Sequence, residues 1–155
     1  MIAPFARSAA HAVPLYAIPA AAAKAWARRQ APLLAQSGFA GAAGDLRALP
    51  DARGRLKGWV LGLGAGDDAF ALAAASEKLG PGTYRLGDVP PHLRGADGAL
   101  GWALGLYAFD RYKKSVRPPP RLLLPKSVDS AEILRIAQHV FLARDLINMP
   151  ANAMG

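Results

Sequence analysis

Short apolar runs alternate along the chain with longer segments whose apolar residues recur at helical spacing. The run at 12–18 predicts a buried strand. The helix formers from Ala20 to Gln30 predict a helix that Pro19 opens, with cations near its carboxyl end. A continuation over Ala31–Gln36 is expected to bend at Pro32, because proline removes a backbone donor.

The middle of the chain predicts a hairpin followed by a helix. Strand-like segments at 45–49 and 56–63 flank the turn-forming tract 50–54. Asp67 or Asp68 is expected to cap the next helix, which runs to about residue 79. Further elements are predicted as strands at 83–86 and 121–124 and a helix at about 96–109.

Three glycines lie on one side of the helix predicted at 96–109. Gly98, Gly101 and Gly105 each cost about 1 kcal/mol relative to alanine within a helix. Close approach of a neighbouring element explains why glycine stands there, while Trp102 supplies bulk on another side. The pattern therefore predicts a tight contact along this helix.

The last helix has the clearest pattern. Asp129 stands three residues before Glu132, an aspartate variant of the capping box. Glu132, Arg135 and His139 share one side, and the helix is expected to end near Asn148. The other side carries apolar residues at helical spacing: Ile133, Ile136, Ala137, Val140, Phe141 and Ile147.

These elements predict an α/β fold with a mixed or largely parallel sheet that helices flank on both faces. The length of 155 residues suits one domain plus a connecting helix. The chain has no cysteine and no apolar run of the roughly 20 residues that a membrane span needs. The run 8–23 resembles a signal peptide, but His11, Pro14 and Pro19 interrupt it, which favours a strand and a helix.

The formal net charge of +8 has two interpretations, a solvated basic surface or attraction to a polyanion. Composition favours the solvated surface. A basic run interleaved at its start with Tyr107, Phe109 and Tyr112 could bind single-stranded nucleic acid, although a solvated loop with anchored aromatics is favoured. The candidate polyanion-binding residues are Arg111, Lys113, Lys114, Arg117, Arg121 and Lys126.

Other candidate sites have simpler interpretations. The glycine turn 62–67 follows a strand, as phosphate-binding loops do, but Asp67 occupies the third glycine position and favours a plain turn. The histidines His11, His92 and His139 lie in different elements and show no zinc-binding spacing. We predict no catalytic and no metal-binding residue in the chain.

Three motifs resemble the leucyl (cytosol) aminopeptidase family. The carboxyl-terminal A-R-D-L-I-N-M-P-A-N-A-M-G, residues 143–155, is similar to the segment that joins that family's amino-terminal domain to its catalytic domain. Met149 and Ala153 stand where the family usually has threonine and an acid. The stretches 100–114 and 60–64 resemble further family segments, so the likeness covers about residues 59–155.

The resemblance implies a macro-domain-like α/β domain over 1–126 and a linking helix over 127–155. It places the chemistry elsewhere, because the catalytic signature N-T-D-A-E-G-R-L is absent and the chain is expected to stop where the catalytic domain begins. The resemblance implies that the parent protein is a cytoplasmic homohexamer that releases amino-terminal residues from peptides. Two divalent metals, Mn or Zn, polarise the scissile carbonyl and activate a water in that mechanism.

A binding module is the alternative to an accessory domain. It would contact nucleic acid through the segment 111–126, a reading that gains weight because some members of the family bind DNA. It could also take an ADP-ribose-like nucleotide in the macro-like fold, but the glycine turn offers no convincing phosphate cradle.

Overall fold

The computed structural model describes residues 3–8, 10–107 and 118–149. Its strands are β1 (Phe5–Ala6), β2 (Val13–Ile18), β3 (Leu46–Pro50), β4 (Leu56–Gly62), β5 (Gly82–Leu86) and β6 (Pro120–Leu123). Its helices are α1 (Ala20–Gln30), α2 (Pro32–Gln36), α3 (Leu72–Lys78), the short 3-10 helix η1 (Pro91–Arg94), α4 (Ala96–Gly105) and α5 (Ser130–Asn148).

The six strands form one mixed sheet in the order β1-β6-β5-β2-β4-β3. Every neighbouring pair is parallel except β3 and β4, which form the predicted antiparallel hairpin. Parallel strands need crossover connections, and here helices supply several of them. The expected α/β class with a mixed sheet is therefore confirmed.

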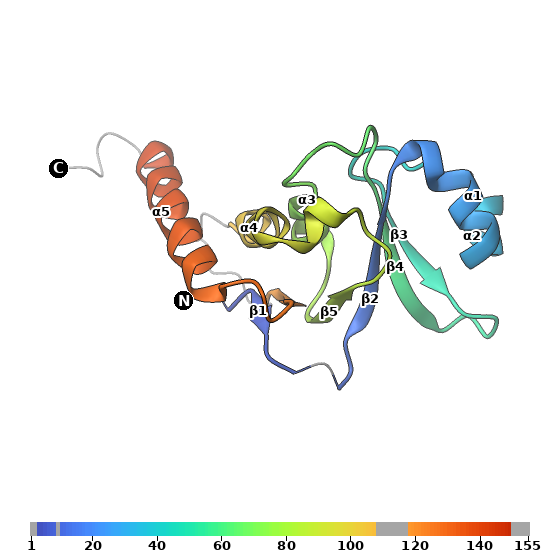
Figure 1. Ribbon diagram of the computed structural model, residues 1–155, viewed down its shortest axis with the longest axis horizontal. Coiled ribbons are helices and arrows are strands. Elements are labelled where there is room, and N and C mark those ends of the chain that lie inside the picture. The colour runs from blue at the N-terminus through green and yellow to red at the C-terminus, as the bar shows by residue number, and fades with distance from the viewer. Residues whose placement is uncertain (1–2, 9, 108–117, 150–155) are drawn as a thin grey trace.

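Alternation along the central strands gives the sheet two apolar faces. In β2, Leu15 and Ala17 belong to one buried cluster, whereas Ile18 belongs to another. In β4, Leu61 joins the first cluster and Val60 the second. Successive side chains of a strand point to opposite faces, so each face needs a cover of helices. Figure 1 shows α1 and α2 on one side of the sheet and α3 and α4 on the other.

The α3–α4 layer is packed closely through the predicted glycines. A Cβ on Gly101 would lie 2.8 Å from Cα of Phe70, just before α3, and one on Gly105 would clash with the Ala73 carbonyl oxygen. Trp102, on another side of α4, is fully buried in the cluster that covers the sheet. The predicted tight contact along this helix is confirmed.

The start of α3 differs from the prediction. The helix begins at Leu72, and neither Asp67 nor Asp68 caps it, since its N-cap is Ala71 without a side-chain bond. Asp68 instead accepts a 2.8 Å hydrogen bond from the backbone N–H of Phe70, which holds a turn before the helix. The short side chain of aspartate can accept a hydrogen bond from the backbone N–H of a turn or from that of a helix N-terminus, and the sequence does not distinguish the two cases.

Helix α5 lies outside these layers and packs against α4 at one end of the molecule (Figure 1). Of the predicted helix at 96–109, α4 ends at Gly105 and Phe109 lies outside the described residues. Within the described part of the chain, none of the helices has the length and apolar character of a membrane span.

Candidate functional site at the junction of α4 and α5

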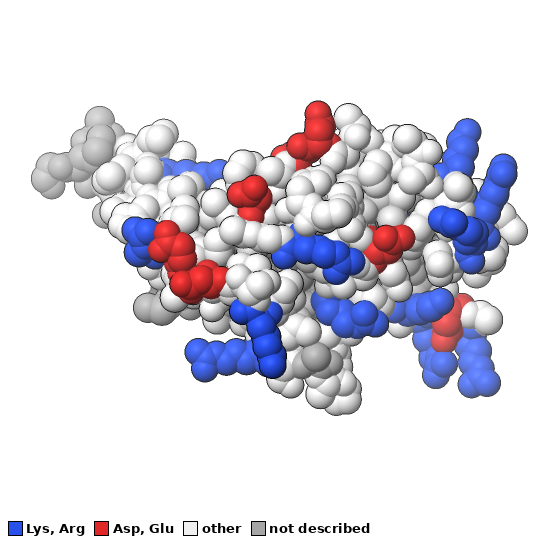
Figure 2. All heavy atoms as spheres, in the orientation of Figure 1, with Lys and Arg blue, Asp and Glu red and all other residues white. Residues whose placement is uncertain are grey.

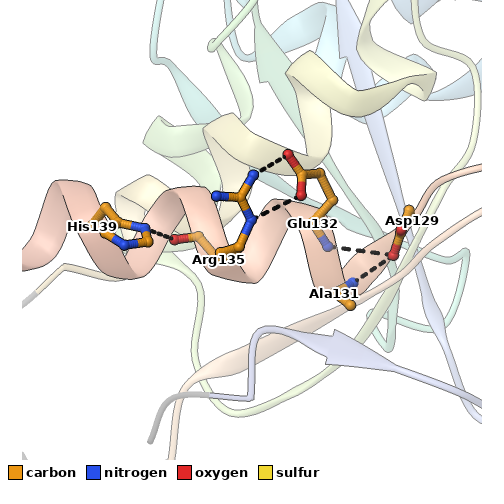
Figure 3. A network of polar contacts seen from close by, with 5 residues as sticks. All are labelled: Asp129, Ala131, Glu132, Arg135 and His139. Atoms are coloured by element: carbon orange, nitrogen blue, oxygen red, sulfur yellow. Dashed lines mark hydrogen bonds and ion pairs between the residues drawn. The ribbon is translucent and has the colours of Figure 1, made fainter.

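The amino end of α5 is fixed by its own first turn. Asp129 Oδ1 accepts hydrogen bonds from the backbone N–H groups of Ala131 at 2.9 Å and Glu132 at 3.3 Å (Figure 3). These bonds satisfy donors that a helix leaves unpaired, so the predicted cap is confirmed. The reciprocal half of a capping box is not formed, because the Glu132 carboxylate is bound by Arg135.

The solvent-facing side of α5 carries a chain of contacts within the helix. Arg135 donates to both carboxylate oxygens of Glu132, at 2.6 and 3.0 Å. This pairing lowers the pKa of Glu132 and raises that of Arg135. His139 Nδ1 lies 2.7 Å from the carbonyl oxygen of Arg135 (Figure 3). The three residues share one side as predicted, and they support the helix without joining it to the sheet.

Small side chains let α5 approach α4. Ile133 and Ala137 of α5 are buried against Ala99 and Ala103 of α4 in one cluster. Alanine on both helices shortens the distance between their axes, and Ile133 fills the remaining space. The first half of α5 is therefore attached by apolar packing.

A polar cluster around Tyr107 attaches the second half of α5. The Tyr107 hydroxyl donates to Asp145 Oδ1 at 2.8 Å and accepts from Asn148 Nδ2 at 3.1 Å. Arg144 lies over the same ring, with Cζ 5.2 Å from its centroid, and the Phe141 ring centroid lies 5.3 Å away. Tyr107, just beyond the end of α4, thus contacts four residues that lie on successive turns of α5.

The electrostatic balance of this cluster keeps Tyr107 protonated. Burial raises the pKa of its hydroxyl most, and the hydrogen bond to Asp145 and the charge of that carboxylate raise it further. The bond from Asn148 and the charge of Arg144 oppose these effects. A protonated hydroxyl can donate to the carboxylate, so the neutral form is the one that holds the two helices together.

The carboxyl end of α5 leaves apolar side chains in solvent. Leu142, Leu146 and Ile147 are 59%, 52% and 81% exposed. Beside them, Pro4, Ala103, Phe141 and Leu142 help to line a cavity of about 300 Å³ between α4 and α5. Single exposed apolar residues are common, but three within two turns next to an apolar cavity indicate a contact surface.

The glycine turn after β4 is filled by the protein's own backbone. A Cβ on Gly62 would lie 2.6 Å from the Gly41 carbonyl carbon, and Gly64 and Gly66 have positive φ angles of 60° and 88°. The Gly64 carbonyl accepts from the N–H of Ala20 at 2.8 Å. The interpretation as a turn that requires glycine is confirmed.

The three histidines lie in different elements of the structure, as the sequence predicts. His11 and His92 are exposed, and His139 lies on α5. Among the described residues, no three His, Asp or Glu side chains are grouped so that they could hold a metal ion. The donor set in this part of the chain does not fit a metal centre.

The structure describes only two of the six candidate polyanion-binding residues. Arg111, Lys113, Lys114 and Arg117 lie outside the described residues. Arg121 is exposed on β6, and Lys126 is exposed in the turn before α5. Figure 2 shows basic side chains at several places on the face in view, many of them at the opposite end of the molecule from α5. The run stays a prediction.

Tyr107, Arg144, Asp145 and Asn148 were not predicted as a site. Each stands within one of the two family-like stretches, 100–114 and 143–155, and the presence of both stretches in one chain is the sequence signal for this site. The structure brings them together because α5 packs on α4 with the carboxyl ends of the two helices side by side.

Comparison with known proteins identifies a consistent set of relatives. A family model described as M17 aminopeptidase, N-terminal domain, matches residues 13–125. A comparison with curated proteins finds no match.

Solved structures similar to this chain include an aminopeptidase and a maturation enzyme. The cytosol aminopeptidase from Coxiella burnetii superposes with a TM-score of 0.79 at 25% identity, over 96% of this chain and 34% of that one. The bottromycin maturation enzyme BotP in complex with Mn gives 0.60 at 30% identity, over 94% and 33%. A second BotP structure gives 0.58 at 32% identity, over 92% and 34%. The chain thus spans about a third of the length of each relative.

Proposed function

Because the chain belongs to the M17 aminopeptidase family and corresponds to its N-terminal domain, we propose that it is the non-catalytic accessory domain of a leucyl-type aminopeptidase. In this proposal the parent protein releases amino-terminal residues from peptides. The relatives are about three times longer than this chain, which leaves room for a catalytic domain.

The observation that carries the proposal is the end of α5. Leu142, Leu146 and Ile147 are exposed there, and the cluster around Tyr107 fixes the direction in which the helix runs. A catalytic domain that follows α5 would cover these side chains. Burying about 100 Å² of apolar surface contributes on the order of 2–3 kcal/mol, so even this small patch would help to orient the two domains.

The metal chemistry belongs to the proposed catalytic domain. Two divalent ions, Mn or Zn, would supply a polarised carbonyl and an activated water there. One BotP structure is described as a complex with Mn, which supports a divalent metal in the family. The described residues of this chain offer no fitting donor set, so we place no catalytic step on them.

The assembly and location are parts of the same proposal. We propose a homohexamer in the cytoplasm, in which this domain shapes access to the active sites. The name of the Coxiella burnetii relative, a cytosol aminopeptidase, supports the location. The alternative, a nucleic-acid or nucleotide-binding module, has no support from the comparisons.

The test compares this chain alone with the same chain joined to its catalytic domain. Hydrolysis of leucine p-nitroanilide with added Mn²⁺ or Zn²⁺ is the readout. We expect no hydrolysis by the 155-residue chain and metal-dependent hydrolysis by the longer protein. An inert longer protein, with both metals tried and the fold verified by circular dichroism, would contradict the enzymatic proposal.

A further inference from the structure

A cleft of about 600 Å³ opens between α2 and the β3–β4 hairpin, far from the α4–α5 junction. Its inner wall is formed by Trp26, Leu34 and Leu49, all at most 5% exposed. The Tyr16 and Trp26 rings lie beside each other, with centroids 5.2 Å apart and planes tilted by 54°. A concave apolar site of this volume is large enough for a small organic ligand.

The polar groups of the cleft favour an anionic ligand. Asp51 Oδ1 accepts from the backbone N–H groups of Arg53 and Arg55 at 2.8 and 2.9 Å, and Asp51 Oδ2 pairs with the Arg55 side chain at 2.9 Å. Three N–H donors of the turn therefore bind its two oxygens. Lys57, on the cleft wall, has no ion pair within 4.0 Å among the described residues, although its charge contributes to lowering the pKa of Asp51.

The surroundings add to this preference. Residues 20–58 contain seven Lys and Arg but only two Asp, and both aspartates are paired with arginines. Figure 2 shows basic side chains gathered at the end of the molecule where Figure 1 places α1, α2 and the β3–β4 turn. A positive potential at the mouth of an apolar cleft attracts anions.

One buried donor also lacks a partner. The indole Nε1 of Trp26 is buried and has no acceptor among the described residues. The same holds for Trp59 and Trp102, but of the three only Trp26 lines this cleft. An unpaired buried donor costs free energy.

We propose that this cleft binds a small carboxylate with a flat aromatic body. The ring lies against Tyr16 and Trp26, between the walls formed by Pro32 and Pro50, and the carboxylate faces Lys57. Aromatic rings pack well in tilted or offset arrangements, as Tyr16 and Trp26 already do. The site is independent of peptide hydrolysis and uses none of the residues at the α4–α5 junction.

The test uses indole-3-acetate and its neutral analogue indole-3-acetamide with the 155-residue chain. Calorimetry is expected to give a Kd on the order of 1 mM or below for the carboxylate, and roughly threefold to tenfold weaker binding of the amide. In ¹⁵N spectra the Trp26 indole resonance, assigned with Trp26→Phe, is expected to shift. The Trp102 indole resonance should stay in place.

Matched variants distinguish the contribution of charge to ligand binding from the contribution of the shape of the cleft. Lys57→Gln is expected to remove the preference for the carboxylate ligand over the amide. Lys24→Gln makes the same charge change outside the cleft and is expected to leave that preference unchanged. Leu33→Ser removes an apolar side chain from the cleft wall and should weaken the binding of both ligands. Leu56→Ser, at a similarly exposed position outside the lining, should leave the binding of both ligands unchanged. All four positions are exposed, so the variants are expected to fold.

Three results with the indole ligands would overturn the proposal. They are equal affinity for the acid and the amide, equal effects of Lys57→Gln and Lys24→Gln, and an unmoved Trp26 resonance at saturating ligand. Binding of acetate as tight as that of indole-3-acetate would likewise overturn it, because the aromatic body would then contribute nothing.

Discussion

The hydroxyl of Tyr107 donates a 2.8 Å hydrogen bond to Asp145 Oδ1, across 38 positions of sequence. The bond joins the end of the α4 layer to the last turns of α5, where Asn148 and Arg144 also contact Tyr107. The first half of α5 is held by alanine packing, so this cluster decides whether the second half stays attached.

Tyr107→Phe is expected to loosen the carboxyl end of α5 while keeping the ring contact with Phe141. Hydrogen exchange of amides 142–148 should become several-fold faster, roughly as expected when a local opening loses one hydrogen bond. Exchange of amides 133–137 should change little. Asp145→Asn offers a second test, since its amide can still accept from Tyr107 and should have the smaller effect.

Tyr107 is expected to deprotonate at a pH above that of an ordinary tyrosine, because burial and Asp145 raise its pKa. A folded-state pKa above the unfolded value gives stability that is fully present below the unfolded value of about 10. That stability is lost as pH rises through the folded pKa. The difference in absorbance at 295 nm between wild type and Tyr107→Phe measures the titration, and a midpoint at or below the ordinary value would contradict the assignment.

Gly105→Ala is expected to destabilise the fold because its Cβ would clash with the Ala73 carbonyl oxygen and the Ser76 hydroxyl of α3. Overpacking costs about 1–3 kcal/mol, which exceeds the gain of up to about 1 kcal/mol from replacing glycine in a helix. Urea unfolding gives the difference. Gly80→Ala is the matched control, since nothing lies within 4 Å of its added Cβ, and it should change stability by less than about 0.5 kcal/mol.

Asp129→Ala should remove the cap of α5 at a cost of about 1 kcal/mol, because two backbone donors lose their acceptor. Asp129→Asn keeps an acceptor oxygen and should retain most of the stability. Thermal unfolding of the three proteins side by side measures the effect. Equal losses in both variants would mean that the charge of Asp129, rather than its hydrogen bonds, stabilises the helix.

Ile147→Ser is expected to leave this chain's stability within about 0.5 kcal/mol, because the side chain is 81% exposed. Joined to the proposed catalytic domain, the same change should lower the unfolding midpoint, since a buried contact is lost. Lys126→Ser, at another exposed position, is the control. If Ile147→Ser left the unfolding midpoint of the longer protein unchanged, the contact between the two domains would have to involve other residues.

Much of the fold follows from local sequence pattern. The run at 12–18 became β2, the tract at 50–54 became the β3–β4 turn, and Asp129 caps α5. These features depend on alternation, turn residues and caps, whose partners lie within a few positions. The two-residue strand β1 gave no such signal, because its pairing with β6 spans almost the whole chain.

The junction and the cleft depend on the tertiary structure. Asp68 and Asp129 both precede helical segments, yet only Asp129 caps its helix, because Asp68 already holds the Phe70 turn. The sequence contains Tyr107 and Asp145 but not their 2.8 Å contact, which requires α5 to pack on α4 through Ala99 and Ala103. Periodicity determines which face of an element is apolar, whereas the packing of elements distant in sequence decides which polar groups meet.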